Sequence, residues 1–371
     1  MKALFNSPLN AFRYLAMALL VPFSLALKAD DHIAATKVAT DIQIPWGMVQ
    51  LTDGQLLVTE RTGTLYRVDT DSGKSTKISG IPKIKSTRQG GFLDLELHPD
   101  YAKNGWIYMS YTSPEGEGDG NNTTISRAKL KDDALVDVEM LYRTSPNSER
   151  PFHYGSRLEF DNDGYLYFTV GDRGQRDEFP QDTTVDAGKV YRIHDDGRIP
   201  KDNPFVDGAK PAIFSYGHRN PQGMALNPET GSIWVNEHGP KGGDEINVIA
   251  KGLNYGWPVI SYGVNYSGTK FTDITEKEGM EQPAHQWTPS MAPSGMVFVT
   301  SDKYPEWQGK ALVGSLKFAY IELVTYDGDT VTKVEKVMEG IGRVRNIRQM
   351  ADGYIYVGLD GQGVVRLEPQ S

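Results

Sequence analysis

Three neighbouring segments of this chain combine polar side chains, glycines and prolines more densely than a protein core requires. They span residues 216–223, 236–247 and 254–258. Chains place such residues in loops, where a rigid scaffold holds them for binding. Taken singly, each residue is compatible with a tight turn that exposes its charge. Taken together, the three segments predict a pocket that binds an anion and a metal ion.

The residue types in these segments indicate how such a pocket would bind. Arg219 stands beside Asn220, and the pair offers several hydrogen-bond donors to carboxylates and carbonyls. The Gly-Pro step at 239–240 and the Asp-Glu pair at 244–245 offer oxygen atoms. Oxygens are the ligands that a hard cation prefers.

A histidine and a carboxylate flank one of the predicted strands. His153 lies just before this strand, and Asp172 follows the strand and its partner turn. A histidine that a carboxylate orients is a suitable general base. A lone histidine is more often structural and caps a turn. That interpretation is applied to His32, His98, His194 and His285.

Further polar residues lie outside these segments. Lys317, Arg343 and Arg345 add cations late in the chain, and alternation within a strand points both arginines the same way. They are either solvated strand charges or partners of an anionic ligand. Gln89 begins another polar segment that leads into a strand. The sequence contains no phosphate loop, dinucleotide fingerprint, His-Glu-x-x-His pattern or Gly-x-Ser-x-Gly elbow.

The elements that position these residues follow one recurring pattern. A turn residue and a glycine precede an alternating apolar strand, which is a hairpin signal. The pattern starts at Asp53, Asn104, Asp163, Thr230, Gln308 and Asp352. Second strands follow several copies, at residues 63–68, 188–193 and 363–367. Repeated β units with long loops at one end predict an all-β fold, a β-propeller that closes on itself.

Closure of the propeller and the number of domains are also predicted. A strand near residues 37–44 is expected to pair with the last blade and shut the ring. The alternatives are a β-sandwich or two β domains. Residues 36–371 show no linker-like change in composition, which favours a single domain.

Composition and the N-terminal segment restrict the class of protein. The chain has 371 residues, a net charge of −9 and no cysteine. The acidic balance without a basic stripe argues against a nucleic-acid partner. The lack of cysteine excludes disulfides and a cysteine nucleophile. Lys2, Arg13 and the apolar run at 14–27 predict a secretory signal peptide over residues 1–29, a periplasmic location and no stable membrane insertion. A retained membrane anchor is the alternative.

Together these segments resemble the soluble quinoprotein sugar dehydrogenases of the glucose/sorbosone dehydrogenase family, most closely its bacterial periplasmic aldose sugar dehydrogenase branch. The resemblance covers nearly all of residues 36–368, and its anchors are residues 153–158, 171–172, 216–223, 237–247 and 254–258. It implies a six-bladed propeller whose central face holds pyrroloquinoline quinone (PQQ) and calcium. It also implies oxidation of an aldose sugar at the anomeric carbon to a lactone.

The resemblance implies roles for individual residues. His153 matches the general base, Asp172 its orienting partner, and Arg219 a residue near the reactive carbonyl of the quinone. The residues that match cofactor contacts are Gln89, Arg219, Asn220, Tyr266, Lys317, Arg343 and Arg345. Those that match calcium ligands are Gly239 and Pro240 at the quinone, with Glu245 and Tyr255 at a second calcium site.

The chain is shorter than the best-known glucose dehydrogenases and has trimmed loops, so strict glucose preference and a stable dimer do not carry over. A monomer or weak dimer is expected, and the electron acceptor stays open. Two rival functions also stay open, a calcium-dependent propeller lactonase or esterase and a cofactor-less binding module. The late cations argue against the first, because a neutral lactone needs no cationic clamp. His153 with Asp172 and Arg219 argues against the second.

Overall fold

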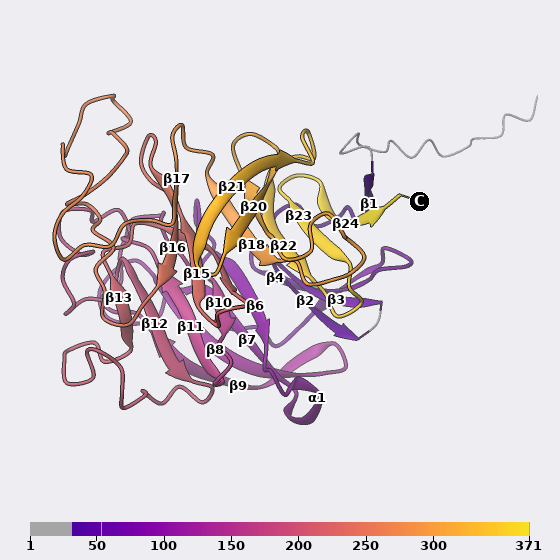
Figure 1. The fold of residues 1–371 in the computed structure, drawn as a ribbon. Coiled ribbons are helices and arrows are strands. Elements are labelled where there is room, and N and C mark those ends of the chain that lie inside the picture. The colour runs from indigo at the N-terminus through magenta and orange to yellow at the C-terminus, as the bar shows by residue number, and fades with distance from the viewer. Residues whose placement is uncertain (1–31, 53, 371) are drawn as a thin grey trace, which may run out of the picture.

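The fold is an all-β propeller of six blades. The computed structural model describes residues 32–52 and 54–370. Within these residues, the strands form six four-stranded antiparallel sheets (Figure 1). The prediction of a six-bladed propeller is therefore confirmed. The predicted signal peptide at 1–29 lies outside the described residues. No helix in the described part of the chain is long and apolar enough to cross a membrane.

Each blade takes four strands from the chain in order, apart from the last. Blade 1 contains β2 (Pro45–Thr52), β3 (Gln55–Glu60), β4 (Thr64–Asp69) and β5 (Ser75–Ile78). Blade 2 contains β6 (Phe92–Leu97), the one-turn helix α1 (Tyr101–Asn104), β7 (Trp106–Ser113), β8 (Asn122–Lys131) and β9 (Ala134–Arg143). Blade 3 contains β10 (Leu158–Phe160), β11 (Tyr165–Val170), β12 (Lys189–His194) and β13 (Ile213–Tyr216).

The second half of the ring repeats this order. Blade 4 contains β14 (Pro221–Leu226), β15 (Ile233–Glu237), β16 (Asp244–Ile249) and β17 (His285–Trp287). Blade 5 contains β18 (Pro293–Phe298), β19 (Ala311–Ser315), β20 (Ile321–Asp327) and β21 (Thr330–Val337). Blade 6 contains β22 (Val344–Gln349), β23 (Ile355–Leu359), β24 (Gly363–Pro369) and, from the other end of the chain, β1 (Ile33–Ala39).

The repeated turn-glycine motif marks the second strand of every blade. It leads into β3, β7, β11, β15, β19 and β23. Gly164 and Gly353, in two of these turns, have φ angles of 80° and 79°. A residue with a side chain rarely adopts such angles, so glycine is required at these hairpin corners.

The ring closes where the two ends of the described chain pair. Strand β1 runs antiparallel to β24, from Ile33 opposite Pro369 to Ala39 opposite Val364. The predicted pairing with the last blade is thus confirmed, although β1 ends at Ala39 and does not reach residue 44. The chain bends over residues 40–44 because it must pass from blade 6 into blade 1 at Pro45.

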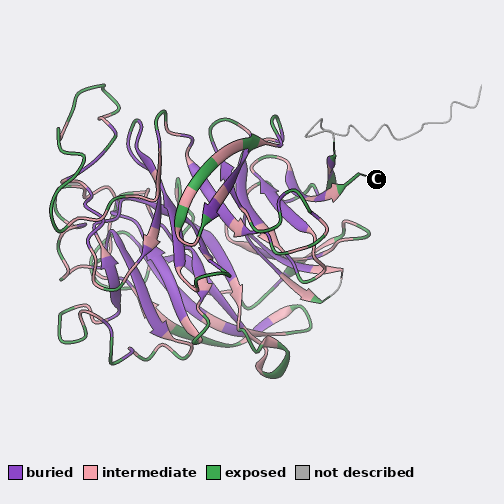
Figure 2. Ribbon diagram, viewed as in Figure 1, coloured by how far each residue is buried: buried purple, intermediate pink, exposed green. Residues whose placement is uncertain are grey.

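The hydrophobic core is divided among the interfaces between neighbouring blades. One cluster contains Leu57 and Leu65 of blade 1 together with Phe92, Ile107 and Met109 of blade 2. Equivalent clusters join the other neighbouring pairs. Figure 2 shows the strands as mainly buried, with exposed residues on the connecting loops. Each large side chain in such a cluster stabilises the fold by about 1.5–3 kcal/mol.

Candidate functional site

Three cavities near the propeller centre are lined mainly by loops before the first strands, loops after the second strands and the long loop between β16 and β17. The outer cavity has a volume of about 400 Å³ and is lined by His153, Asp172 and Arg219, among others. The inner cavity, of about 250 Å³, is more enclosed. A small side cavity shares Arg219 and Trp257 with the outer cavity and His238 with the inner one.

The structure brings nearly all of the predicted site residues to these cavities. His153, Asp172, Arg219, Pro240 and Tyr266 line the outer cavity. Gln89, Asn220, Arg343 and Arg345 line the inner cavity. Arg219, Gly239, Glu245 and Tyr255 line the side cavity. Lys317 is exposed and is absent from all three linings; its Nζ donates to the carbonyl of Ser290 at 3.2 Å.

His153 and Asp172 form a hydrogen-bonded pair at the wall of the outer cavity. The His153 Nδ1 atom donates to Asp172 Oδ1 at 2.7 Å. The same oxygen accepts from the Gly174 backbone N–H at 2.7 Å, and Asp172 Oδ2 accepts from Trp257 Nε1 at 2.8 Å. The His153 backbone has a φ angle of 57° and donates its N–H to Gln89 Oε1 at 2.9 Å. The imidazole is therefore held from several sides, and its Nε2 is left as an acceptor.

The pKa values of both residues of this pair are lowered, for different reasons. Burial, followed by the Arg219 charge, lowers the pKa of His153, while Asp172 opposes this shift. Burial alone would raise the pKa of Asp172, but His153 and Arg219 together with the Gly174 N–H outweigh it and the pKa is lowered. At neutral pH the pair is thus a neutral imidazole held by a carboxylate, the state that a general base requires.

Arg219 and Asn220 lie where the cavities meet. The Arg219 backbone N–H donates to Glu237 Oε2 at 2.7 Å, and its Nη1 donates to the carbonyl of His238 at 2.9 Å. Asn220 Oδ1 accepts from the Gly155 N–H at 3.2 Å. Both residues are buried, with exposed fractions of 6% and 3%. The guanidinium charge is therefore fixed beside the His153 pair.

The inner cavity concentrates positive charge. Four arginines line it, Arg61, Arg88, Arg343 and Arg345, and its lining has no carboxylate. Arg343 Nε and Arg345 Nη2 both contact Oδ2 of Asp360, at 3.0 and 2.9 Å. The two arginines therefore share one carboxylate partner. Strand alternation does not explain this, because Arg343 precedes β22 and Arg345 lies at a register shift of that strand.

Arg61 points to an anionic ligand, and sequence reasoning missed it. Burial and then the nearby Arg345 charge lower the pKa of the Arg61 guanidinium. Its Nε is buried without a hydrogen-bond partner in the described residues, although Nη1 donates to the carbonyl of Arg88 at 2.7 Å. Repulsion between the arginines and a buried donor without an acceptor both destabilise the protein when no ligand is bound. An anion with several carboxylates would relieve both costs, so the cavity fits such a cofactor.

The side cavity brings together two carboxylates, beside Arg219. Glu237 and Glu245 approach one another here, and Asn247 Nδ2 donates to both, at 3.0 and 3.1 Å. Burial, followed by the Glu237 charge, raises the pKa of Glu245 to about 8. Asn247 Oδ1 is buried without a partner among the described residues. These oxygens fit a hard cation. The predicted ligand Tyr255 uses its hydroxyl to contact Val248 and Ala250, so only its carbonyl could face a cation.

The Gly239-Pro240 turn presents two backbone carbonyls. Among the described residues, neither carbonyl accepts a backbone hydrogen bond, and Pro240 O is approached by Ser290 Oγ at 3.5 Å. Asp244 was expected to offer free oxygens, but it accepts the N–H groups of Gly239 and Ala292 at 2.8 and 2.7 Å. Asp244 therefore holds the turn in place. The described residues contain no cluster of three or more acidic, histidine or cysteine side chains suited to a metal, so carbonyls would have to complete a site.

Other residues of the site carried weak signals or none in the sequence. Trp257 and Glu237 fall within the polar segments but had no assigned role. His238 lines two cavities, and its Nε2 donates to Pro293 O at 2.7 Å. Burial and then Arg219 lower its pKa to about 3, so it is neutral. Asp360 and Arg61 lie outside every segment that the motifs marked, and only the folded ring brings them to the site.

Comparison with known proteins gives consistent similarities. The glucose/sorbosone dehydrogenase family model matches residues 42–366. The chain is 40% identical over 350 residues to the aldose sugar dehydrogenase YliI of Escherichia coli, covering 92% of this chain and 94% of that protein. It is 31% identical over 338 residues to quinoprotein glucose dehydrogenase B of Acinetobacter calcoaceticus, covering 83% of this chain and 69% of that protein.

One solved structure with its cofactor is also similar. The PQQ-bound form of aldose sugar dehydrogenase from Streptomyces coelicolor superposes with a TM-score of 0.76 and 27% identity, covering 93% of this chain and 100% of that chain.

Proposed function

This chain belongs to the glucose/sorbosone dehydrogenase family, and we propose that it oxidises an aldose sugar at the anomeric carbon to a lactone, with PQQ and calcium as cofactors. The observation that carries the proposal is the His153–Asp172 pair beside a cavity lined by four arginines. A general base next to a polyanion site is the combination that quinone-dependent sugar oxidation requires. Relatives named aldose sugar and quinoprotein glucose dehydrogenases support this reading.

In this proposal the sugar binds in the outer cavity with its anomeric hydroxyl toward His153 Nε2. His153 would remove the hydroxyl proton. The electron pair left on the oxygen would form the new C=O bond, and the anomeric hydrogen would leave with the electron pair of its C–H bond as a hydride. Asp172 keeps Nδ1 protonated and stabilises the imidazolium that forms. When bound, the quinone supplies the two-electron acceptor. Base catalysis of this kind contributes about 10²–10⁴ in rate.

The proposed cofactor contacts follow from charge. Arg343, Arg345 and Arg61 would bind the carboxylates of PQQ by charge-assisted hydrogen bonds, which are stronger than neutral ones. Asn220 and Gln89 would add neutral contacts. Arg219, which lines the outer and side cavities, would face the edge of the quinone near the sugar. Lys317 and Tyr266 are exposed, and we retain them as candidates at the rim of the site.

Calcium would take oxygen ligands at two places. The carbonyls of Gly239 and Pro240 would hold an ion near the quinone, where it acts as a Lewis acid. Glu245 and the Tyr255 carbonyl would belong to a second ion in the side cavity. The two carboxylates of this cavity support the second site, because burial and the Glu237 charge raise the pKa of Glu245 and a cation would balance the negative charge.

Reconstitution of the purified protein tests the proposal. Adding PQQ with calcium should produce a new absorption band and sugar-dependent reduction of a dye, across a panel of pentoses, hexoses and disaccharides. A protein that hydrolyses lactones without PQQ would instead be the calcium-dependent hydrolase, and a protein that binds glycans without turnover would be the binding module. Periplasmic export is proposed on the N-terminal pattern alone.

A further inference from the structure

One arginine at the centre of the ring donates hydrogen bonds to backbone carbonyls of three blades. Arg157 lies just before β10 in blade 3, and its side chain has an exposed fraction of 3%. Its Nε donates to the carbonyl of Gln222 at 2.5 Å, its Nη2 to that of Arg345 at 2.9 Å and its Nη1 to that of Trp46 at 3.3 Å. These carbonyls belong to blades 4, 6 and 1.

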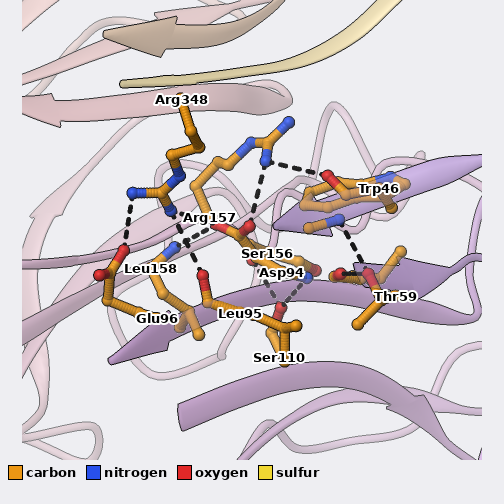
Figure 3. A network of polar contacts seen from close by, with 12 residues as sticks. Trp46, Thr59, Asp94, Leu95, Glu96, Ser110, Ser156, Arg157, Leu158 and Arg348 are labelled. Atoms are coloured by element: carbon orange, nitrogen blue, oxygen red, sulfur yellow. Dashed lines mark hydrogen bonds and ion pairs between the residues drawn. The ribbon is translucent and has the colours of Figure 1, made fainter. Parts of the chain in front are cut away.

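The charge of Arg157 is balanced by blade 2. Its Nη1 also contacts Asp94 Oδ1 at 3.2 Å, and Asp94 is fully buried. Asp94 Oδ2 accepts the Leu158 N–H at 3.1 Å and lies 3.5 Å from Arg348 Nη2 (Figure 3). Burial lowers the pKa of Arg157 to about 10, so the guanidinium remains charged at neutral pH. The indole of Trp46 covers it, with Cζ 4.0 Å from the ring centroid.

The three carbonyls occupy equivalent places in their blades. In five blades the first strand has a bulge, in which two of its residues face one residue of the second strand. In blades 1, 4 and 6 the register shifts at Trp46-Gly47, Gln222-Gly223 and Arg345-Asn346. The first residue of each bulge, Trp46, Gln222 or Arg345, lines the inner cavity. Arg157 therefore bonds the backbone of the residues whose side chains form the floor of that cavity.

Arg157 itself stands at the second place of the blade 3 bulge. The Ser156 N–H donates to Thr169 O at 2.8 Å, and the Thr169 N–H donates to Arg157 O at 3.1 Å, so two residues again face one. Blades 1, 4 and 5 have glycine at this second place, at 47, 223 and 295. An added Cβ at Gly47 would lie 2.8 Å from Asp94 Cα. The close approach of these backbones leaves room at the centre for few side chains, and Arg157 is one of them.

We infer that Arg157 is a positioning residue for the cofactor, which fixes the floor of the inner cavity by holding the backbones of Trp46, Gln222 and Arg345. This inference rests on the proposed function, because it assigns PQQ to that cavity. Arg157 does not line the cavity and acts through residues that do. Arg345 in turn contacts Gln222 Oε1 at 3.4 Å, so displacement of one backbone moves two polar groups of the floor.

Arg157→Lys tests the inference while keeping the charge beside Asp94. A lysine ammonium lacks the planar fork of guanidinium and cannot hold three separated carbonyls in the same geometry. The measurement is the PQQ dissociation constant of the purified apoprotein in calcium, by absorbance titration or equilibrium dialysis, with thermal unfolding measured in parallel. We expect PQQ binding to weaken by roughly tenfold or more, which is about 1.4 kcal/mol.

Ser294→Ala is the matched control. Ser294 occupies the first place of the blade 5 bulge, is fully buried, and donates to Val344 O at 2.7 Å and Gly314 O at 3.1 Å. It lines none of the three cavities. We expect it to lower the melting temperature while leaving PQQ affinity within about twofold of the parent. A double variant, Arg157→Met with Asp94→Asn, removes both charges and serves if the lysine variant does not fold.

The outcomes separate the inference from the proposed function. Weaker PQQ binding in the Arg157 variants alone supports the positioning role. Unchanged PQQ affinity in a folded Arg157 variant overturns it, as does an equal loss of affinity in Ser294→Ala. A parent protein that binds no PQQ refutes the proposed function itself.

Discussion

Asp172→Asn is the sharpest test of the proposed base, because it removes the charge and leaves the shape. Asp172 accepts three hydrogen bonds, from His153 Nδ1 and the Gly174 N–H at one oxygen and from Trp257 Nε1 at the other. Asparagine has one oxygen and one NH₂ group. Its NH₂ must therefore face either the His153 side or the indole N–H, and at least one donor loses its acceptor.

The magnitude follows from the bond to His153. A hydrogen bond to a charged group contributes about 1.5–3 kcal/mol. Each 1.36 kcal/mol in the barrier changes the rate about tenfold. If the Asp172 charge stabilises the imidazolium that forms in the transition state, the rate of sugar oxidation should fall roughly 10- to 160-fold. PQQ affinity should change little, because Asp172 does not line the inner cavity.

The pH dependence gives a second signature. His153 must be neutral to accept a proton, so the rate rises with pH through its pKa. Burial and Arg219 lower this pKa below the ordinary value of 6.5, whereas Asp172 raises it. The acidic limb of the parent is therefore expected below pH 6.5. In Asp172→Asn the raising influence is lost, and the limb should move to lower pH while the plateau falls.

The assay is single-turnover reduction of bound PQQ by sugar, followed by absorbance from about pH 5 to 9. Asp186→Asn is the control, because Asp186 is also buried and accepts from Tyr142, Ser145 and Lys210 at 2.7, 3.0 and 2.6 Å. It lines none of the three cavities. A parent-like plateau and limb in Asp172→Asn, or an equal rate loss in the control, would refute the reasoning.

Three further outcomes are expected. His153→Ala should lower single-turnover PQQ reduction by about 10²-fold or more with PQQ affinity retained; reduction at the parent rate would exclude the base assignment. Arg61→Met should weaken PQQ binding more than sugar binding. The control Arg67→Met removes a surface ion pair with Asp133 and should alter neither affinity. Equal PQQ affinity in the two variants would remove Arg61 from the cofactor site. Calcium should raise the melting temperature of the parent and do so less in Glu245→Gln, because an ion that binds only the folded state stabilises it; melting curves that a strong chelator leaves unchanged would contradict the metal assignment.

The second strand of each blade could be predicted from the sequence, because its signals are local. A glycine turn such as that at Gly164 and the alternation that follows it need no tertiary partner. The first strands gave weaker signals. Their bulges interrupt the alternation with pairs such as Trp46-Gly47 and Gln222-Gly223, so the apolar period breaks where the strand meets the central cavity.

The His153–Asp172 pair could also be anticipated, because the two residues flank the β10–β11 hairpin and lie 19 positions apart. The contacts of Arg157 could not. Its carbonyl partners at Trp46 and Arg345 are 111 and 188 positions away, and only the closed ring brings them together. Arg61 was missed for the same reason. What marks it as a site residue is the nearby charge of Arg345, and the two arginines come together only in the folded ring.

The distribution of charge across the site argues for an anion and a metal bound side by side. The chain carries a net charge of −9, yet the inner cavity has four arginines in its lining and no carboxylate. The side cavity, which shares His238 with it, brings Glu237 and Glu245 together under burial. The folded protein gains no stability by placing arginines together in one cavity and carboxylates together in the adjacent one. A bound polycarboxylate would compensate the arginines, and a bound cation would compensate the carboxylates. A hydrolase for neutral lactones would need the cation but not the arginines, and a protein-binding propeller would need neither of the buried charge groups.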